Sequence, residues 1–216
     1  IKESFMAQVL AVVNQKGGVG KTTTSVNLAA YLASFRTPVA VIDLDPQANA
    51  TAGLGVTVGE NDPTVYEVLL EETTATKALK PTKHEALNVI PATPDLVGAA
   101  IELLDQPQRE YRLQKALKAL DEHFSFILID CPPSLGMLTV NALTAAERVL
   151  VPVQCEYYAL EGLNQLMHTV DMVRKHLNPD LQVLGALLTM YDRRVKLSRE
   201  VMKDVRRNFP GHVFDS

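Results

Sequence analysis

Short apolar runs rich in β-branched residues alternate with amphipathic stretches along this chain, and this alternation restricts its fold more than any other feature. The apolar runs occupy residues 9–13, 39–42, 87–90, 126–129, 149–153 and 183–188. The amphipathic stretches occupy residues 21–34, 95–104, 109–121, 137–146, 160–176 and 196–208. Strands that are apolar on both faces and separated by helices imply right-handed crossovers and a mainly parallel sheet. We therefore predict a doubly wound α/β fold with helices on both faces of the sheet.

The length and composition favour one globular domain. The chain has 216 residues, of which 47% are hydrophobic and 21% charged, and its net charge is -4. Such a chain can bury one sizeable core. It has no apolar run of about 18 residues and no secretory signal, so we expect a cytoplasmic protein without a membrane partner. Cys131 and Cys155 have no C-x-x-C spacing, which favours buried thiols over a disulfide or a zinc site.

The segment NQKGGVGKTT, residues 14–23, follows the first apolar run and looks like a phosphate-binding loop. Its glycines allow a tight turn with N–H groups directed at an anion, and the helix that follows adds its positive end. In such a loop Lys21 reaches the β- and γ-phosphates, and the Thr22 hydroxyl binds Mg²⁺. The alternative is a glycine-rich turn with incidental charge. A strand, then glycines, then Lys-Thr at the start of a helix is the full context of a phosphate-binding loop, and this argues against the simple turn.

Three aspartates end two further strands, where ligands bind in folds of this class. Asp130 closes the run FSFILI and has the placement of a Walker-B carboxylate, which holds Mg²⁺ through its water shell. Asp43 and Asp45 lie two residues apart at the end of another strand, so an extended backbone directs both side chains the same way. We expect one to face the waters of the metal and the other to orient an attacking water. The alternative for a single aspartate is a helix cap or a turn.

Lys16 lies five residues before Lys21, at the mouth of the loop. The phosphates bound by its own chain are served by backbone amides and by Lys21, so Lys16 is free to reach outward. Its positive charge is useful if a second subunit docks its nucleotide face to face with the first. A purely local contribution to the field around the phosphates is the alternative.

These segments resemble the ParA/Soj family of partitioning ATPases, within the MinD/ParA superfamily. KGGVGKTT is similar to the family's deviant Walker A motif, and five further blocks follow in the family's order: DLDPQANATAGLG, IPATPDLVGA, ILIDCPPSLG, VPVQCEYYALEG and LLTMYDRR. The resemblance covers nearly the whole chain. It implies a single P-loop ATPase domain over residues 1–216, which we expect to be truncated at its C-terminal end, since relatives continue into a further block and a helix.

The resemblance also implies roles for individual residues. Lys16 matches the signature lysine that contacts the nucleotide of the partner subunit, and Asp45 matches the aspartate needed for hydrolysis, so the implied catalytic set is Lys16, Lys21 and Asp45. The implied Mg²⁺ site is formed by Thr22, Asp43 and Asp130. The implied ATP-binding residues are Lys16, Gly17, Gly18, Val19, Gly20, Lys21, Thr22, Thr23, Met190 and Asp192.

By this resemblance the chain is an ATPase that uses ATP and Mg²⁺ for chromosome or plasmid partitioning. It implies an ATP-dependent homodimer that binds DNA non-specifically in the nucleoid. Hydrolysis stimulated by a ParB/Spo0J-type centromere-binding protein would then reset the dimer. Whether the replicon is a chromosome or a plasmid stays open, as does the identity of the stimulating protein.

A basic stripe is the candidate DNA contact. Residues 193–207 include seven basic and two acidic residues, so this segment carries a net charge of +5 and the rest of the chain carries -9. On a helix, steps of three and four place the cations in one row, and Leu197, Val201 and Val205 in another that would pack inward. The alternative is a solvated helix face. The candidate DNA-binding residues are Arg193, Arg194, Lys196, Arg199, Lys203, Arg206 and Arg207.

Three other functions compete. An iron–sulfur protein of the same superfamily would place its cysteine ligands differently from Cys131 and Cys155. A MinD-like membrane-associated positioning ATPase would need a C-terminal amphipathic anchor, and none is visible in this sequence. A module that binds ATP without hydrolysing it would lack Asp45 or Asp130, and both are present.

Overall fold

The computed structural model describes residues 6–156 and 159–215 and has one eight-stranded sheet. The strand order is β3-β4-β2-β5-β1-β6-β7-β8, and every neighbouring pair is parallel except β3 with β4. The strands are β1 (Gln8–Val12), β2 (Val39–Asp43), β3 (Lys80–Pro81), β4 (Leu87–Ile90), β5 (Phe126–Asp130), β6 (Arg148–Gln154), β7 (Gln182–Thr189) and β8 (Val213–Phe214). The predicted doubly wound α/β fold is therefore confirmed.

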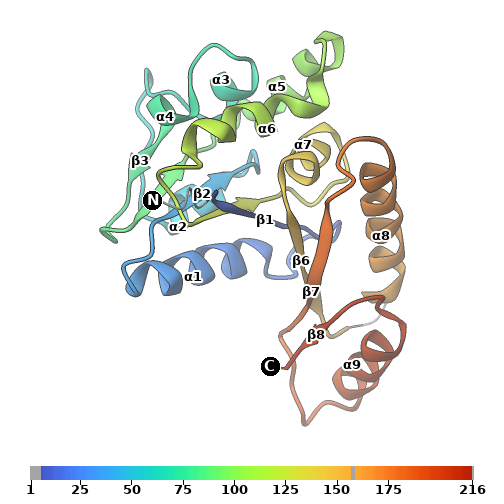
Figure 1. Cartoon of the computed structure of the whole chain (residues 1–216). Helices are drawn as coiled ribbons and strands as arrows, with labels where there is room; N and C mark the ends of the chain where they lie inside the picture. Colours follow the sequence, from blue (N-terminus) through green and yellow to red (C-terminus); the bar gives the residue numbers. More distant parts are fainter. Residues whose placement is uncertain (1–5, 157–158, 216) are drawn as a thin grey trace, which may run out of the picture.

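Helices lie on both faces of this sheet (Figure 1). The α-helices are α1 (Lys21–Ser34), α2 (Asn49–Gly53), α3 (Val65–Leu69), α4 (Ala75–Ala78), α5 (Leu96–Glu102), α6 (Arg112–Leu117), α7 (Met137–Ala145), α8 (Ala159–His176) and α9 (Lys196–Asn208). Short 3₁₀ turns cover Leu103–Asp105, Arg109–Tyr111 and Lys118–Leu120. The helix predicted over residues 109–121 is thus α6 with a 3₁₀ turn at each end.

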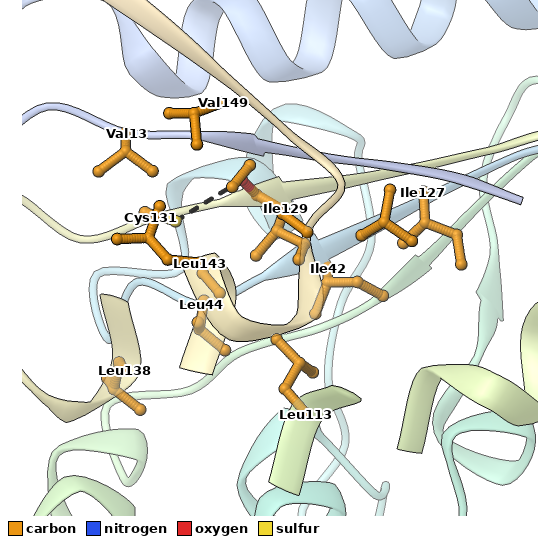
Figure 2. Close-up of a cluster of buried hydrophobic side chains, with 14 of the residues drawn as sticks. Val13, Ile42, Leu44, Leu113, Ile127, Ile129, Cys131, Leu138, Leu143 and Val149 are labelled. Atoms are coloured by element: carbon orange, nitrogen blue, oxygen red, sulfur yellow. Dashed lines mark hydrogen bonds between the residues drawn. The ribbon is translucent and has the colours of Figure 1, made fainter. Parts of the chain in front are cut away.

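The alternation of side chains along each strand explains why the apolar runs predicted strands. In β2, Ala40 and Ile42 belong to the cluster under α3 to α8, whereas Val39 and Val41 belong to the cluster under α1 and α2. Successive side chains of a strand point to opposite faces, so a strand covered on both sides must be apolar throughout. Figure 2 shows part of the larger cluster, in which the Cys131 thiol lies 3.8 Å from the Ile129 carbonyl oxygen.

Both cysteines are free and buried, as the sequence predicted. Burial raises the pKa of the Cys131 thiol well above its ordinary value and also raises the pKa of Cys155. Neither thiol is therefore an exposed, easily ionised ligand. Both contribute apolar volume to the larger core cluster.

The short elements α2, α3, α4 and β3 lie between β2 and β4 and were not predicted. A helix of four or five residues is too short to show a helical period, and side-chain caps determine where it starts. Thr64 and Glu67 form a capping box at the start of α3, and the Thr74 hydroxyl accepts a hydrogen bond from the Lys77 N–H at the start of α4.

Candidate active site

The carboxyl ends of three adjacent strands bring the predicted aspartates together. Asp130 at the end of β5 pairs in register with Val12 of β1 on one side and with Asp43 of β2 on the other. Asp43 and Asp130 have no exposed surface, and Asp45 is 7% exposed. The negative charges of Asp43 and Asp45 both raise the pKa of Asp130. The predicted cluster of acids is therefore present.

The phosphate-binding loop joins β1 to α1 and is held by contacts with the ends of β6 and β7, which follow β1 on one side of the sheet. Gly20 has φ 88°, in the left-handed region that favours glycine, and the helix starts at the next residue. The Asn14 side-chain amide donates to the Pro152 carbonyl of β6 at 2.6 Å. The Thr189 hydroxyl at the end of β7 donates to the Val19 carbonyl at 2.8 Å. These contacts fix the loop in place before any nucleotide binds.

Two hydroxyl groups from α1 hold the Asp130 carboxylate. Thr22 donates to Oδ2 at 2.8 Å, and Ser25 donates to Oδ1 at 2.7 Å. Burial raises the pKa of Asp130 to about 6, although both hydrogen bonds favour the ionised form and lower it. Thr22 and Asp130 thus place a hydroxyl and a carboxylate oxygen side by side, which are oxygen ligands of the kind that Mg²⁺ takes.

Lys21 is buried in the middle of these groups. Its ammonium donates to the Lys16 carbonyl at 2.9 Å, so it already lies across the loop. Burial lowers the pKa of Lys21, while the nearby charges of Asp130 and Asp45 raise it. The Lys21 ammonium is therefore close to both acids, at the start of α1.

Asp43 and Asp45 do not share one environment. Both Asp43 oxygens accept hydrogen bonds inside the protein, from Thr51 and from the Asp45 N–H. Asp45 lies in the turn after β2, where its Oδ1 accepts from the Gln47 N–H at 2.9 Å. Asp43 is the last residue of β2, whereas Asp45 lies in the turn that follows the strand.

Lys16 forms an ion pair with Glu156, which follows β6. The side chains of Lys16 and Glu156 are 42% and 35% exposed, so this is a surface pair at the mouth of the loop. Such pairs contribute about 0–1 kcal/mol. Lys16 is therefore held only weakly by its own chain.

Met190 and Asp192 follow the end of β7, beyond the residue that contacts the loop. Met190 is 61% exposed. The carboxylate of Asp192 accepts hydrogen bonds from the Arg194 guanidinium at 2.8 to 3.2 Å, which lowers the pKa of Asp192. Both residues lie at the carboxyl edge of the sheet, with the predicted nucleotide-binding residues.

Sequence reasoning missed several side chains that support this site: Asn14, Ser25, Thr51, Glu156 and Thr189. Ser25 could have been found, because it lies one helical turn after Lys21 and so faces the same strand ends. The contacts of Thr51 and Thr189 could not, because their partners are 8 and 170 residues away in the sequence.

The burial of Asp130 makes the stability of the nucleotide-free chain pH-dependent. A carboxyl whose folded pKa is raised to about 6 stabilises the fold fully below its unfolded pKa and loses that contribution as the pH rises through 6. At pH values well above 6, where Asp130 is ionised, the free energy of unfolding is then lower by roughly 3 kcal/mol. We expect Asp130→Asn to be more stable than wild type at neutral pH, with a smaller difference near pH 4, in urea unfolding without nucleotide. The exposed Asp95→Asn is the control, and equal pH dependence in all three proteins would contradict the expectation.

Known proteins resemble this chain over nearly its full length. A family model described as AAA domain matches residues 7–183. The chain is 51% identical over 210 residues to the chromosome partitioning protein ParA of Myxococcus xanthus, covering 97% of this chain and 74% of that protein. It is 52% identical over 209 residues to the sporulation initiation inhibitor protein Soj of Bacillus subtilis, covering 97% of this chain and 83% of that protein. The chain belongs to the ParA/Soj family.

A solved structure confirms that this ParA/Soj chain has the fold of a nucleotide-binding protein. A protein called cobyrinic acid a,c-diamide synthase from Mycobacterium smegmatis, solved with ADP and magnesium, has a TM-score of 0.92 and 45% identity. The match covers 98% of this chain and 86% of that one. The name of that protein describes a synthase, whereas the partitioning relatives are more similar in sequence. The family assignment therefore rests on those relatives.

Five residues of the basic stripe lie on α9, at the opposite edge of the sheet from β3 (Figure 1), and Arg193 and Arg194 lie just before this helix. All seven predicted cations are exposed. Ion pairs join Arg194 to Asp192, Lys196 to Glu200 and Arg206 to Asp215. Ser198 and Val205 are buried on the inner side, whereas Leu197 is 38% exposed, so the predicted inward row is wrong at Leu197. None of the helices in residues 6–156 and 159–215 has the length and apolar character needed to cross a bilayer.

Proposed function

We propose that this ParA/Soj chain is an ATP-driven switch that partitions DNA. ATP closes two chains face to face, the closed pair binds DNA non-specifically in the nucleoid, and hydrolysis stimulated by a ParB-type partner releases it. The observation that carries the proposal is the meeting of Lys21, Thr22, Asp45 and Asp130 at the start of α1. The family is one of partitioning ATPases, and its relatives favour this function over a MinD-like one.

The residues at the loop fit ATP with Mg²⁺. Within the described part of the chain, no three His, Cys, Asp or Glu side chains are arranged so that together they could hold a metal ion. Mg²⁺ does not need such a group, because it binds through one or two carboxylates together with substrate phosphates and water. Thr22 and Asp130 would hold the ion. When bound, the ion would supply positive charge that offsets the negative charge of the phosphates.

The chain's own groups would then carry out hydrolysis. The start of α1 and the Lys21 ammonium stabilise negative charge on the transferring phosphoryl group. Asp45 orients the attacking water and accepts a hydrogen bond from it. Lys16 leaves its weak pair with Glu156 and reaches the triphosphate held by the second chain. ATP binding and dimerisation are thereby coupled, and loss of the γ-phosphate opens the dimer.

The basic stripe on α9 would bind DNA phosphates. Arg199, Lys203 and Arg207 are exposed and enter none of the ion pairs found in residues 6–156 and 159–215. They can therefore pair with phosphates without breaking an ion pair of the described chain. Two chains in a dimer would present two such stripes, which adds phosphate contacts and salt-dependent affinity.

This function predicts DNA retention that depends on ATP and on the stripe. The wild-type chain should bind DNA with a slowly hydrolysed ATP analogue and much less with ADP. Changing Arg199, Lys203 and Arg207 to Gln should weaken binding, and each phosphate that is no longer neutralised should lower the log–log salt slope by about 0.9. The measurement is a salt titration of DNA binding by fluorescence anisotropy.

A matched control changes three exposed lysines outside the basic stripe, Lys77, Lys83 and Lys118, to Gln. This variant loses the same charge and should keep the wild-type salt slope. Equal weakening in both variants would mean that the stripe is not the DNA site. Equal binding of wild type with ADP and with the analogue would contradict the switch itself.

A further inference from the structure

The turn that holds Asp45 has a backbone that needs support. It joins β2 to α2, and within it the Ala48 N–H donates to the Asp45 carbonyl at 2.9 Å. Ala48 has φ 53°, in the left-handed region that side chains other than glycine rarely adopt. The Asp45 carboxylate itself is tied to the Gln47 N–H. A strained turn of this kind keeps its shape only when neighbouring groups hold it.

Asp43 supplies one half of that support. Its Oδ1 accepts from the Asp45 N–H at 3.2 Å, which ties the start of the turn to the end of β2. Its Oδ2 accepts from both the N–H and the hydroxyl of Thr51, at 2.8 and 2.7 Å. The carboxylate therefore clamps the two ends of the turn together, and it does so without any exposed surface.

Thr51 supplies the other half. It is 3% exposed, and its hydroxyl makes two hydrogen bonds at once. It donates to Asp43, and it accepts from the Ala92 N–H at 3.1 Å, just after β4. One hydroxyl thus connects the turn to two adjacent strands of the sheet, β2 and β4. A hydroxyl can act as donor and acceptor together, and an alkyl group of the same shape can do neither.

We propose that Thr51 is a positioning residue for ATP hydrolysis, acting on Asp45 through Asp43. The inference rests on the proposed role of Asp45 in orienting water. It assigns Asp43 chiefly to support of the turn. Without the Thr51 hydroxyl, Asp43 and the Ala92 N–H are left buried with fewer partners, and the turn no longer has one fixed position. Water is then oriented less well, whereas the phosphate-binding loop on the other side of β5 is unaffected.

The test compares Thr51→Val, which keeps the shape and removes the hydroxyl, with Thr51→Ser, which keeps the hydroxyl. Thr51→Val should lower kcat at least about tenfold, while the Kd for the ATP analogue changes less than about threefold. Thr51→Ser should restore most of the turnover. Amide hydrogen exchange, measured without nucleotide, should be faster at Asp45 and Ala92 in Thr51→Val only.

The outcomes separate the two claims. A wild-type chain that hydrolyses no ATP counts against the proposed function, and the exchange data still test the support of the turn. Wild-type kcat in Thr51→Val overturns the inference, as do equal reductions of kcat and nucleotide affinity. Unchanged exchange at Asp45 and Ala92, or a Thr51→Ser protein as impaired as Thr51→Val, overturns it as well. If Thr51→Val does not fold, exchange and turnover of Thr51→Ala give the same comparison.

Discussion

Replacing Asp45 with alanine should lower ATP turnover by orders of magnitude and leave the proposed ATP-dependent dimer intact. General-base and water-orienting groups contribute about 10²- to 10⁴-fold to rate, so we expect a reduction of that size. Nucleotide affinity should change little, because Lys21 and the start of α1 stay in place. The measurements are steady-state phosphate release and the mass in solution with an ATP analogue.

Asp45→Asn separates the charge of this residue from its place in the turn. The amide oxygen of asparagine can still accept the hydrogen bond from the Gln47 N–H, so the turn should keep its shape. We therefore expect Asp45→Asn to be as inactive as Asp45→Ala and as stable as wild type. Normal hydrolysis by either variant would show that another group orients the water.

Lys16→Ala should prevent dimerisation while nucleotide binding persists. Removing one partner of a charge pair buried in an interface costs about 2–5 kcal/mol, so the dimer dissociation constant should rise at least about 30-fold. Nucleotide binding should persist, because in the proposed site Lys21 and the loop backbone hold the nucleotide of the same chain. The measurement is molecular mass in solution with ADP and with the ATP analogue, alongside nucleotide titrations.

Glu156→Gln is the matched control for Lys16→Ala. It breaks the same ion pair within the chain but keeps the lysine. The dimer should therefore form as well as in wild type, or at lower nucleotide concentration, since Lys16 no longer has to leave a partner. If Lys16→Ala weakens nucleotide affinity and dimerisation to the same extent, the role of this lysine is local to its own phosphates.

The sheet could be predicted from the sequence because of how its strands are buried. Residues such as Val41 and Ile42 point to opposite faces and are both covered by helices, so the local composition alone reports the strand. The sequence also predicted that Asp43 and Asp130 end neighbouring strands, and in the structure the two residues pair in register. The order of strands and the neighbours of each end follow from crossovers between distant segments, and these have no local signal.

The supporting contacts of the site could not be predicted for a physical reason. The hydrogen bond from the Thr189 hydroxyl to the Val19 carbonyl depends on the sheet order, which places β7 two strands from β1. The hydrogen bond from the Ala92 N–H to the Thr51 hydroxyl depends on β4 lying beside β2. A threonine in an apolar run or a short helix looks ordinary in sequence. Leu197 illustrates the converse, since helical spacing placed it on the inner row and the packing of α9 leaves it exposed.

The hydrogen bond between Thr189 and Val19 also has a mechanical consequence. Thr189 is the last residue of β7, and residues 190–195 alone separate it from the first residue of α9. The loop that receives phosphate and the helix that displays cations are therefore tethered through one short connection. The Cys155 N–H also donates to the Thr189 carbonyl at 3.3 Å, so β6 holds the start of that connection even when the bond to Val19 is broken.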